Sequence, residues 1–305
     1  MSTAIEPAPR IDRSRSADVP RASRGVATRP KRRDWPLIGL WIGLVVAAII
    51  WIVPFVFMFI TSVKSQADIA NLAPWALPTH WEWGNYTDAA QVGNIWVSGA
   101  NSLIIAVIKV PLGLLLAAMA AFALSRLKFR WQQLLLGVIA LGTLIPVQVA
   151  LGPLFSTMLS LNLLNTKVGL MLPYLAFGVS YQVFILYGFF KAIPEELDEA
   201  ARIDGAGNWR LFWQVIMPLA KPALAALFIL DFVSTWNEYP MALTLLQTTD
   251  QFTIPLGITN FQTQYGSNYP QLNAYIIMSI LPVLIVYLLF QRYFVQGALA
   301  GAVKG

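Results

Sequence analysis

The strongest constraint on this chain is its series of long apolar stretches. A transmembrane helix needs about 20 mostly apolar residues to cross the hydrocarbon layer, and six stretches reach that length. They cover residues 35–62, 97–124, 133–157, 168–190, 219–245 and 274–294. Hydrophobic residues make up 57% of the chain and charged residues 12%, whereas soluble domains have roughly 45–50% and about 25%. The sequence therefore predicts an all-α integral membrane protein with six transmembrane helices.

The positions of the basic residues predict the side of the membrane that each loop occupies. With the N-terminus inside, 18 of the 21 lysines and arginines fall in cytoplasmic segments, and only Lys64 and Lys167 fall in outer loops. Cytoplasmic loops carry the excess of Lys and Arg in membrane proteins. We therefore expect a multi-pass protein of the bacterial plasma membrane with both termini in the cytoplasm.

Residues 1–34 form a basic tail in front of the first span. The tail holds nine of the basic and four of the acidic residues, and so five of the six net positive charges of the chain. It has few large apolar residues, which predicts a disordered cytoplasmic segment. The high isoelectric point of the chain thus comes from the tail. It does not indicate that a folded domain binds nucleic acid.

The composition also excludes several kinds of chemistry. The chain has no cysteine and one histidine, His80, so thiolate metal sites and cysteine nucleophiles are excluded and a zinc site is disfavoured. A Ser-His-Asp triad would have to use His80, which lies in a loop rich in Pro and Trp. No G-x-x-x-x-G-K-[ST] motif is present, so the chain is not its own P-loop ATPase. We expect no catalytic residue, metal or cofactor in this chain.

Two charged residues lie inside the predicted spans, Lys109 in the second and Asp231 in the fifth. A charge at the bilayer centre costs about 2.5–3.5 kcal/mol on insertion scales unless it is paired or hydrated. Antiparallel spans would place both residues at a similar depth. We hypothesise that they form a structural ion pair, with a substrate site as the alternative.

The segment 191–218, between the fourth and fifth spans, reads as two short helices joined by a turn. Pro194 suits the first turn of the first helix, and the acidic residues that follow complement its dipole. Gly205 is expected to end that helix, and Asn208 to cap the second. On the first helix, Leu197, Ala200 and Ala201 form a small apolar patch. Two interpretations stay open at this point, an interfacial connector and a docking element.

The residue order in this segment resembles the EAA loop of binding-protein-dependent ABC importers. That loop has Glu-Ala-Ala, three residues, Gly, nine residues, and then Ile-x-Leu-Pro. The matching residues here are Glu199, Ala200, Ala201, Gly205, Val215, Met217 and Pro218. Val and Met replace Ile and Leu with little change in volume. The longer run Glu-Ala-Ala-Arg-Ile-Asp-Gly-Ala and the stretch Trp236-Asn237-Glu238 are typical of carbohydrate permeases.

The C-terminal residues 294–305 are similar to the tail of the smaller permease subunit of maltose-type importers. The resemblance covers about residues 35–305. It implies one N-terminal helix followed by a five-helix type I ABC importer core, with the EAA loop at 191–218 and a C-terminal tail at 295–305.

The resemblance implies a permease subunit of an ATP-driven sugar importer that has no enzyme activity of its own. ATP and Mg²⁺ would bind to a partner ATPase. The implied partners are a second permease subunit, two ATP-binding subunits, an extracytoplasmic sugar-binding protein, the sugar and membrane lipid. Most of the sugar contacts in maltose-type systems come from the larger permease, so this subunit would line the path.

The resemblance also implies roles for particular residues. The expected ATPase-coupling residues are Leu197, Glu199, Ala200, Ala201, Asp204 and Gly205. The tail residues expected between the ATPases are Gln296, Gly297, Gly301 and Lys304. The residues expected in the loop that contacts the binding protein are Phe261, Gln262, Gln264 and Tyr265.

Several functions remain as alternatives to uptake of a di- or oligosaccharide. Within the same class, a glycerol-3-phosphate or polyol importer is possible, although phosphate recognition favours Arg or Lys and the spans offer only Lys109. A secondary transporter is a distant alternative, with only Asp231 and Glu238 as coupling-ion carboxylates. An intramembrane enzyme is disfavoured by the lack of cysteine and of a usable histidine.

Overall fold

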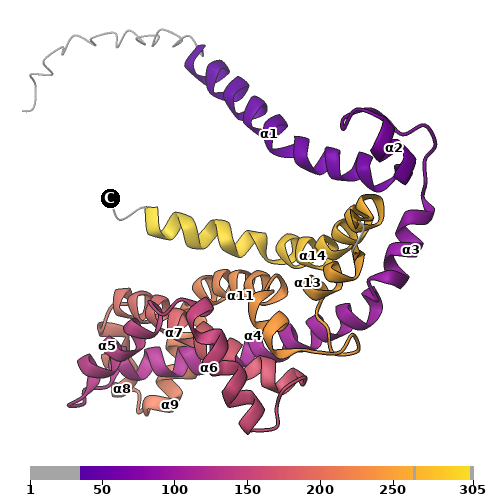
Figure 1. Cartoon of the computed structure of the whole chain (residues 1–305). Helices are drawn as coiled ribbons and strands as arrows, with labels where there is room; N and C mark the ends of the chain where they lie inside the picture. Colours follow the sequence, from indigo (N-terminus) through magenta and orange to yellow (C-terminus); the bar gives the residue numbers. More distant parts are fainter. Residues whose placement is uncertain (1–34, 264–265, 303–305) are drawn as a thin grey trace, which may run out of the picture. The chain divides into compact units, whose positions relative to one another are not determined.

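The computed structural model describes residues 35–263 and 266–302, and nearly all of them are helical (Figure 1). The basic tail predicted at 1–34 lies outside the described residues. Helix α1 (Trp35–Ser62) contains the boundary between two compact units, which falls between Trp51 and Ile52. The first unit contributes the apolar first part of α1. The second unit, from Ile52 onward, holds every other element described here.

The second unit contains both long and short helices. Three are long, α4 (Ile95–Arg126), α7 (Lys167–Ala192) and α14 (Tyr269–Ala302), and the end of α1 from Ile52 to Ser62 also belongs to this unit. The shorter helices are α2 (Gln66–Asn71), α3 (Gly84–Val92), α5 (Gln132–Gly142), α6 (Val147–Ser160), α8 (Glu196–Ile203), α9 (Asn208–Leu211), α10 (Met217–Leu219), α11 (Lys221–Trp236), α12 (Pro240–Leu245) and α13 (Ile254–Gly257). A π-helix (Phe212–Ile216) and a 3-10 helix (Ile258–Phe261) complete the helical set.

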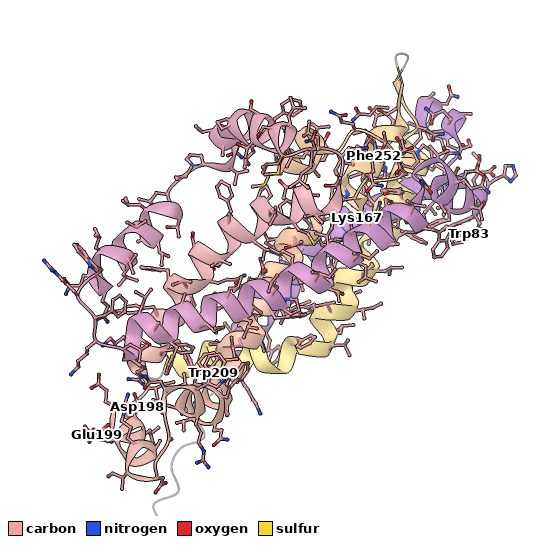
Figure 2. All side chains as sticks on the ribbon, turned by 90° about the horizontal axis from the view of Figure 1, so that it is seen from below. Trp83, Lys167, Asp198, Glu199, Trp209 and Phe252 are labelled. Carbon is pink, nitrogen blue, oxygen red and sulfur yellow. The ribbon has the colours of Figure 1, made fainter. Side chains whose placement is uncertain are left out.

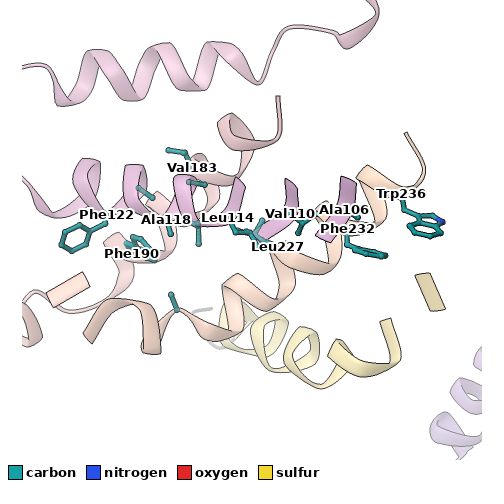
Figure 3. Close-up of a cluster of buried hydrophobic side chains, with 14 of the residues drawn as sticks. Ala106, Val110, Leu114, Ala118, Phe122, Val183, Phe190, Leu227, Phe232 and Trp236 are labelled. Atoms are coloured by element: carbon teal, nitrogen blue, oxygen red, sulfur yellow. The ribbon is translucent and has the colours of Figure 1, made fainter. Parts of the chain in front are cut away.

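The core of the second unit lies where α4 meets α7 and α11. Figure 3 shows buried side chains of α4, from Ala106 to Phe122, packed beside Val183 of α7 and Leu227 of α11. The buried positions of α4 recur every three or four residues, so they share one face. Many of them are small, including Ala117, Ala118 and Ala121. Small residues let transmembrane helices approach closely, and the α4–α7 packing is the most extensive between any two described elements.

The N-terminal end of α4 packs against one buried tyrosine. Tyr275 of α14 is fully buried, and its hydroxyl donates to the carbonyl of Ile254 at 3.0 Å. A Cβ at Gly257 would lie 2.0 Å from the Tyr275 hydroxyl, and one at Gly93 would lie 2.3 Å from its ring. Glycine at these two positions therefore lets α3, α13 and α14 close around the tyrosine.

Two of the predicted spans are broken in the structure. The stretch predicted at 133–157 consists of α5 and α6, which meet at 96°. The break ends at Pro146, whose ring removes a backbone donor and favours extended geometry in the residue before it. The stretch predicted at 219–245 contains α11 and α12, separated at Asn237–Tyr239, and the chain also bends by 75° between α10 and α11.

Four helices among the residues described are long and apolar enough to cross a membrane, and the number is six if each bent pair forms one span. The fold is thus all-helical apart from a two-residue antiparallel ladder between β1 (Gln262–Thr263) and β2 (Gly266–Ser267). The backbone of α14 also continues as helix to Ala302, where a separate tail was predicted from residue 295.

Candidate functional site

The two ends of the second unit carry different groups of polar and aromatic side chains. Figure 2 shows Asp198, Glu199 and Trp209 at one end, and Trp83, Lys167 and Phe252 at the other. The predicted coupling segment and the predicted outer loops therefore lie at opposite ends of the helices. Between them, a cavity with both polar and apolar lining residues lies among α4, α7 and α11.

Helix α8 forms the centre of the predicted coupling segment. It runs from Glu196 to Ile203 with Asp204 as its C-cap, and Gly205 then adopts a left-handed backbone with φ of +76°. This conformation favours glycine and reverses the chain after a helix. Asn208 was predicted to cap the next helix, but Gly207 occupies the cap position and Asn208 instead accepts a hydrogen bond from Arg202 at 3.1 Å. The turn leaves α8 projecting from the end of the bundle.

The outward face of α8 is apolar with acidic neighbours. Leu197 is 42% exposed and Ile203 is 86% exposed, and Ala200 and Glu199 are exposed between them. Asp204 and Gly205 are exposed as well, whereas Ala201 is half-buried against the core. Five of the six predicted coupling residues therefore lie on an open surface, together with Ile203, which the sequence analysis missed.

The inward face of α8 is attached to the end of α4 through Arg126. The Nε atom of Arg126 lies 3.1 Å from Oδ2 of Asp198, and Nη2 donates to the carbonyl of Ile193 at 2.8 Å. Burial raises the pKa of the Asp198 carboxyl above its ordinary value, and the Arg126 guanidinium opposes that shift. The ion pair and the hydrogen bond thus join α8, and Ile193 just before it, to the end of α4.

An aromatic cluster secures the segment after α8. Phe212 is buried, and its ring centroid lies 5.2 Å from that of Phe122 in α4 and 5.0 Å from that of Trp213. Trp209 stacks on Phe212 from the exposed side. Phe212 also begins the π-helix, a form that recurs at functional sites. The segment is thus anchored to α4 a second time, by apolar contact.

The two charges inside the bundle contact each other. Nζ of Lys109 donates to Oδ1 of Asp231 and also to Oγ1 of Thr235, the latter at 3.2 Å. Lys109 is 3% exposed and Asp231 is 9% exposed. A Cβ at position 178 would lie 2.9 Å from Nζ of Lys109, so Gly178 makes room for the lysine. The hypothesised ion pair is present and joins α4 to α11.

A cavity of about 260 Å³ lies beside this ion pair. One face of α7 and one face of α11 supply most of its wall. The lining residues from these helices and the turn after α11 are Tyr174, Phe177, Gly178, Tyr181, Gln182, Leu227, Leu230, Asp231, Ser234, Thr235 and Glu238. The spacing of three and four residues in both helices explains why these side chains face one another.

Glu238 holds the turn between α11 and α12. Its side chain accepts from the backbone amides of Met241 at 2.7 Å and Ala242 at 3.1 Å, and from the hydroxyl of Tyr174. The carboxylate thereby satisfies the free amides at the start of α12. Of the Trp236-Asn237-Glu238 stretch, Glu238 lines the cavity and Trp236 is buried in the core.

The remaining predicted site residues have mixed outcomes. Phe261 was expected in a contact loop, but it is 2% exposed and packs on Tyr275 with ring centroids 5.2 Å apart. Gln262 is exposed in β1, and Gln264 and Tyr265 lie outside the described residues. Gln296, Gly297 and Gly301 lie on the backbone of α14, and Lys304 lies outside the described part. Phe261 thus anchors the base of the hairpin.

The described residues contain no cluster of three or more His, Cys, Asp or Glu side chains that could hold a metal ion. The candidate functional features are the exposed face of α8, the Arg126–Asp198 pair and the cavity. The structure is thus a helical bundle with a partly polar cavity within it and an amphipathic helix at one end.

Comparison with known proteins identifies the family. The profile of the family described as "Binding-protein-dependent transport system inner membrane component" matches residues 109–299, and the chain belongs to this family. It is 39% identical, over 87% of its length and 96% of the relative's, to a putative ABC transporter permease protein, ORF2, of Caldicellulosiruptor sp.. It is 38% identical, over 82% and 83%, to the diacetylchitobiose uptake system permease protein NgcG of Streptomyces coelicolor.

A solved structure is similar as well. A chain from a bacterial ABC transporter involved in the import of the acidic polysaccharide alginate aligns with a TM-score of 0.72 and 26% identity. The alignment covers 88% of this chain and 100% of that chain. The helical arrangement described above is therefore the type I permease fold.

Proposed function

We propose that this chain is a permease subunit of an ATP-driven importer for sugars, of the di- or oligosaccharide class. It would form the path together with a second permease subunit, receive the sugar from an extracytoplasmic binding protein, and couple to two ATP-binding subunits. The relatives that transport diacetylchitobiose and alginate support the sugar class. In this scheme α8 lies on the cytoplasmic side, where ATP and Mg²⁺ are bound by the partners.

The observation that carries the proposal is the two-sided construction of α8. Its outer face presents Leu197, Ala200 and Ile203 to a partner, and its inner face is attached to α4 through Asp198 and Arg126. A helix that is open on one side and fixed on the other transmits the motion of whatever binds the open side. Closure of the ATPase dimer would tilt α8 and α4 together and switch the path between its two open states.

The remaining predicted contacts form part of the same proposal. The segment around Gln296, Gly297, Gly301 and Lys304 would reach between the ATPases, and deletion of residues 297–305 should lower ATP turnover. The segment that contains Gln262, Gln264 and Tyr265 would meet the binding protein. A glycerol-3-phosphate importer is less well supported, since Lys109 is the single cation that lines the cavity and it is already paired with Asp231.

The experiment that tests the coupling role reverses one charge. Glu199→Lys should reduce the affinity for the ATPase subunits about ten-fold or more, because a like charge then faces a basic partner surface. Glu82→Lys makes the same change in an exposed residue next to Trp83, at the opposite end of the helices, and is the matched control. The readouts are co-purification of the ATPase subunits and sugar uptake in proteoliposomes. Wild-type co-purification and uptake with Glu199→Lys would refute the coupling role.

A further inference from the structure

The cavity between α7 and α11 contains buried polar atoms that the protein leaves without partners. Gln182 is 1% exposed, and neither its Nε2 nor its Oε1 has a hydrogen-bond partner within the described chain. Oδ2 of Asp231 is buried and unpartnered in the same way, although Oδ1 receives the Lys109 ammonium. Buried polar groups in proteins nearly always have partners. Both side chains line the same cavity, so a molecule held there can supply the missing partners.

The chemistry of these atoms describes the missing partner. The Gln182 amide offers two donors and an acceptor, and Oδ2 of Asp231 offers an acceptor only. A hydroxyl group donates one hydrogen bond and accepts others, so a molecule with neighbouring hydroxyls satisfies both side chains at once. Ser234, which also lines the cavity, adds a further hydroxyl.

Aromatic rings form the apolar part of the same wall. Tyr174, Phe177 and Tyr181 line the cavity from α7, and Tyr181 is 47% exposed. The faces of such rings carry negative charge density, which attracts the weakly positive C–H groups of a sugar ring. Hydroxyl-binding groups next to aromatic faces suit a molecule with polar edges and a C–H face.

The charge of the cavity selects against anions. Its one lining cation, Lys109, is neutralised by Asp231, and Glu238 adds a carboxylate that Tyr174 and the amides of α12 hold in place. Recognition of a carboxylate or phosphate uses an unpaired Arg or Lys. Among the residues lining this cavity, a neutral ligand meets no repulsion, whereas an anionic one faces an excess of negative charge.

From these observations we infer that the cavity is a sugar subsite belonging to this subunit, which binds one neutral, hydroxyl-bearing sugar unit through Gln182, Asp231 and Tyr181. Its volume of about 260 Å³ falls below the roughly 300–1,000 Å³ of sites for drug-sized ligands, which limits it to a single ring. The inference rests on the proposed sugar-import function, and it gives this permease a part in choosing the sugar.

The test uses the complete importer with its binding protein, reconstituted in proteoliposomes. Gln182→Leu keeps the side-chain size and removes both unpartnered polar atoms. We expect it to lower uptake of a neutral N-acetylglucosamine disaccharide at subsaturating concentration at least ten-fold. In the complex trapped with ADP and vanadate, the amount of radiolabelled disaccharide retained should fall in parallel, while the trapped nucleotide stays at the wild-type level. Ser180→Ala, on the same helix but outside the cavity lining, is the control.

Stability separates a binding role from a structural one. Because the Gln182 amide has no protein partner, Gln182→Leu should leave the melting temperature of the complex unchanged or raise it. If Gln182→Leu does not assemble, variants of Tyr181 test the subsite instead, because this side chain is exposed at the cavity. Tyr181→Phe should retain the disaccharide, and Tyr181→Ala should lose it several-fold.

Each result has a distinct meaning. If the wild-type importer moves no disaccharide of the neutral class and none of a wider neutral panel, the proposed function fails. If the wild type transports and Gln182→Leu or Tyr181→Ala retains sugar at the wild-type level, the subsite is overturned and the function stands. Stronger uptake of an oligouronate than of the neutral disaccharide would also overturn the inferred selectivity.

Discussion

Helix α4 carries two ion pairs that are built differently. At the Lys109 pair, the ammonium contacts both Asp231 and Thr235, and the side chains are almost fully buried. At the Arg126 pair, Nε lies close to Asp198 without the alignment of a hydrogen bond, and Nη1 and Asp198 Oδ1 have no partner among the residues described. Within the described part of the chain, each pair leaves one carboxylate oxygen without a partner, Oδ2 of Asp231 and Oδ1 of Asp198. The two cations differ, because the Lys109 ammonium has two partners, whereas Nε and Nη1 of Arg126 lack a hydrogen bond next to the proposed docking surface.

The difference in the hydrogen bonding of the two cations suggests different structural roles for the two pairs. A pair with satisfied donors fixes the position of two helices relative to each other. A pair with unused donors can change its geometry, or gain contacts when another protein covers it, without breaking a completed network. Three variants, taken from the largest expected effect to the smallest, test this contrast.

Breaking the Lys109 pair should have the largest effect. Lys109→Met leaves Asp231 as an unpaired buried charge, which should cost about 3–5 kcal/mol of folding stability. The double variant Lys109→Met with Asp231→Leu removes both charges and should recover most of that loss. Thermal unfolding of the purified complex measures both. A single variant as stable as the wild type would show that the pair contributes little.

Breaking the Arg126 pair should cost less. Arg126→Met removes the bond to the Ile193 carbonyl and the contact with Asp198, an expected loss of about 1.5–3 kcal/mol. The effect should be local, with faster hydrogen exchange of the α8 amides and unchanged sugar retention. Lys128→Met, in an exposed residue just after the end of α4, is the control. Equal loss of protection in α7 and α11 would contradict the distinction between the two pairs.

The smallest effect is a dependence of α8 on pH. The pKa of Asp198 in the folded protein is raised above its ordinary value of 3.8, by burial. Folding then favours the protonated carboxyl, so its stabilising contribution is present below pH 3.8 and is lost as the pH rises through the folded-state pKa. Relative to Asp198→Asn, wild-type α8 should lose protection from hydrogen exchange as the pH rises above 3.8. A rising difference over that range would show that the Arg126 attraction dominates.

The sequence allowed the long elements and the ion pair to be predicted for physical reasons. Apolar runs of 20 residues have few alternatives to a membrane helix. Two opposite charges within such runs are costly unless they meet, and this led to Lys109 and Asp231. The coupling segment was recognised from its residue order, which identified Glu199 and Gly205 without any knowledge of their neighbours.

Other features of the structure could not be predicted, because they depend on contacts between residues that are far apart in the sequence. Asp198 and Glu199 are adjacent acids on one short helix, and only the position of Arg126 determines that Asp198 faces inward. Pro146 was visible, but prolines are tolerated within membrane helices, so the 96° break at that point was missed. Gln182 was also missed. The signal that could have found it is a lone amide in the middle of an apolar span.

The contacts of α4 have a mechanical consequence. The 17 residues from Lys109 to Arg126 span about 25 Å of helix, so a tilt of about 10° at one end displaces the other by about 4 Å. The Lys109–Asp231 bond would not survive that displacement if α11 stayed in place. If α8 tilts α4 as proposed, we therefore expect α11 to move together with α4, because the Lys109–Asp231 pair joins them.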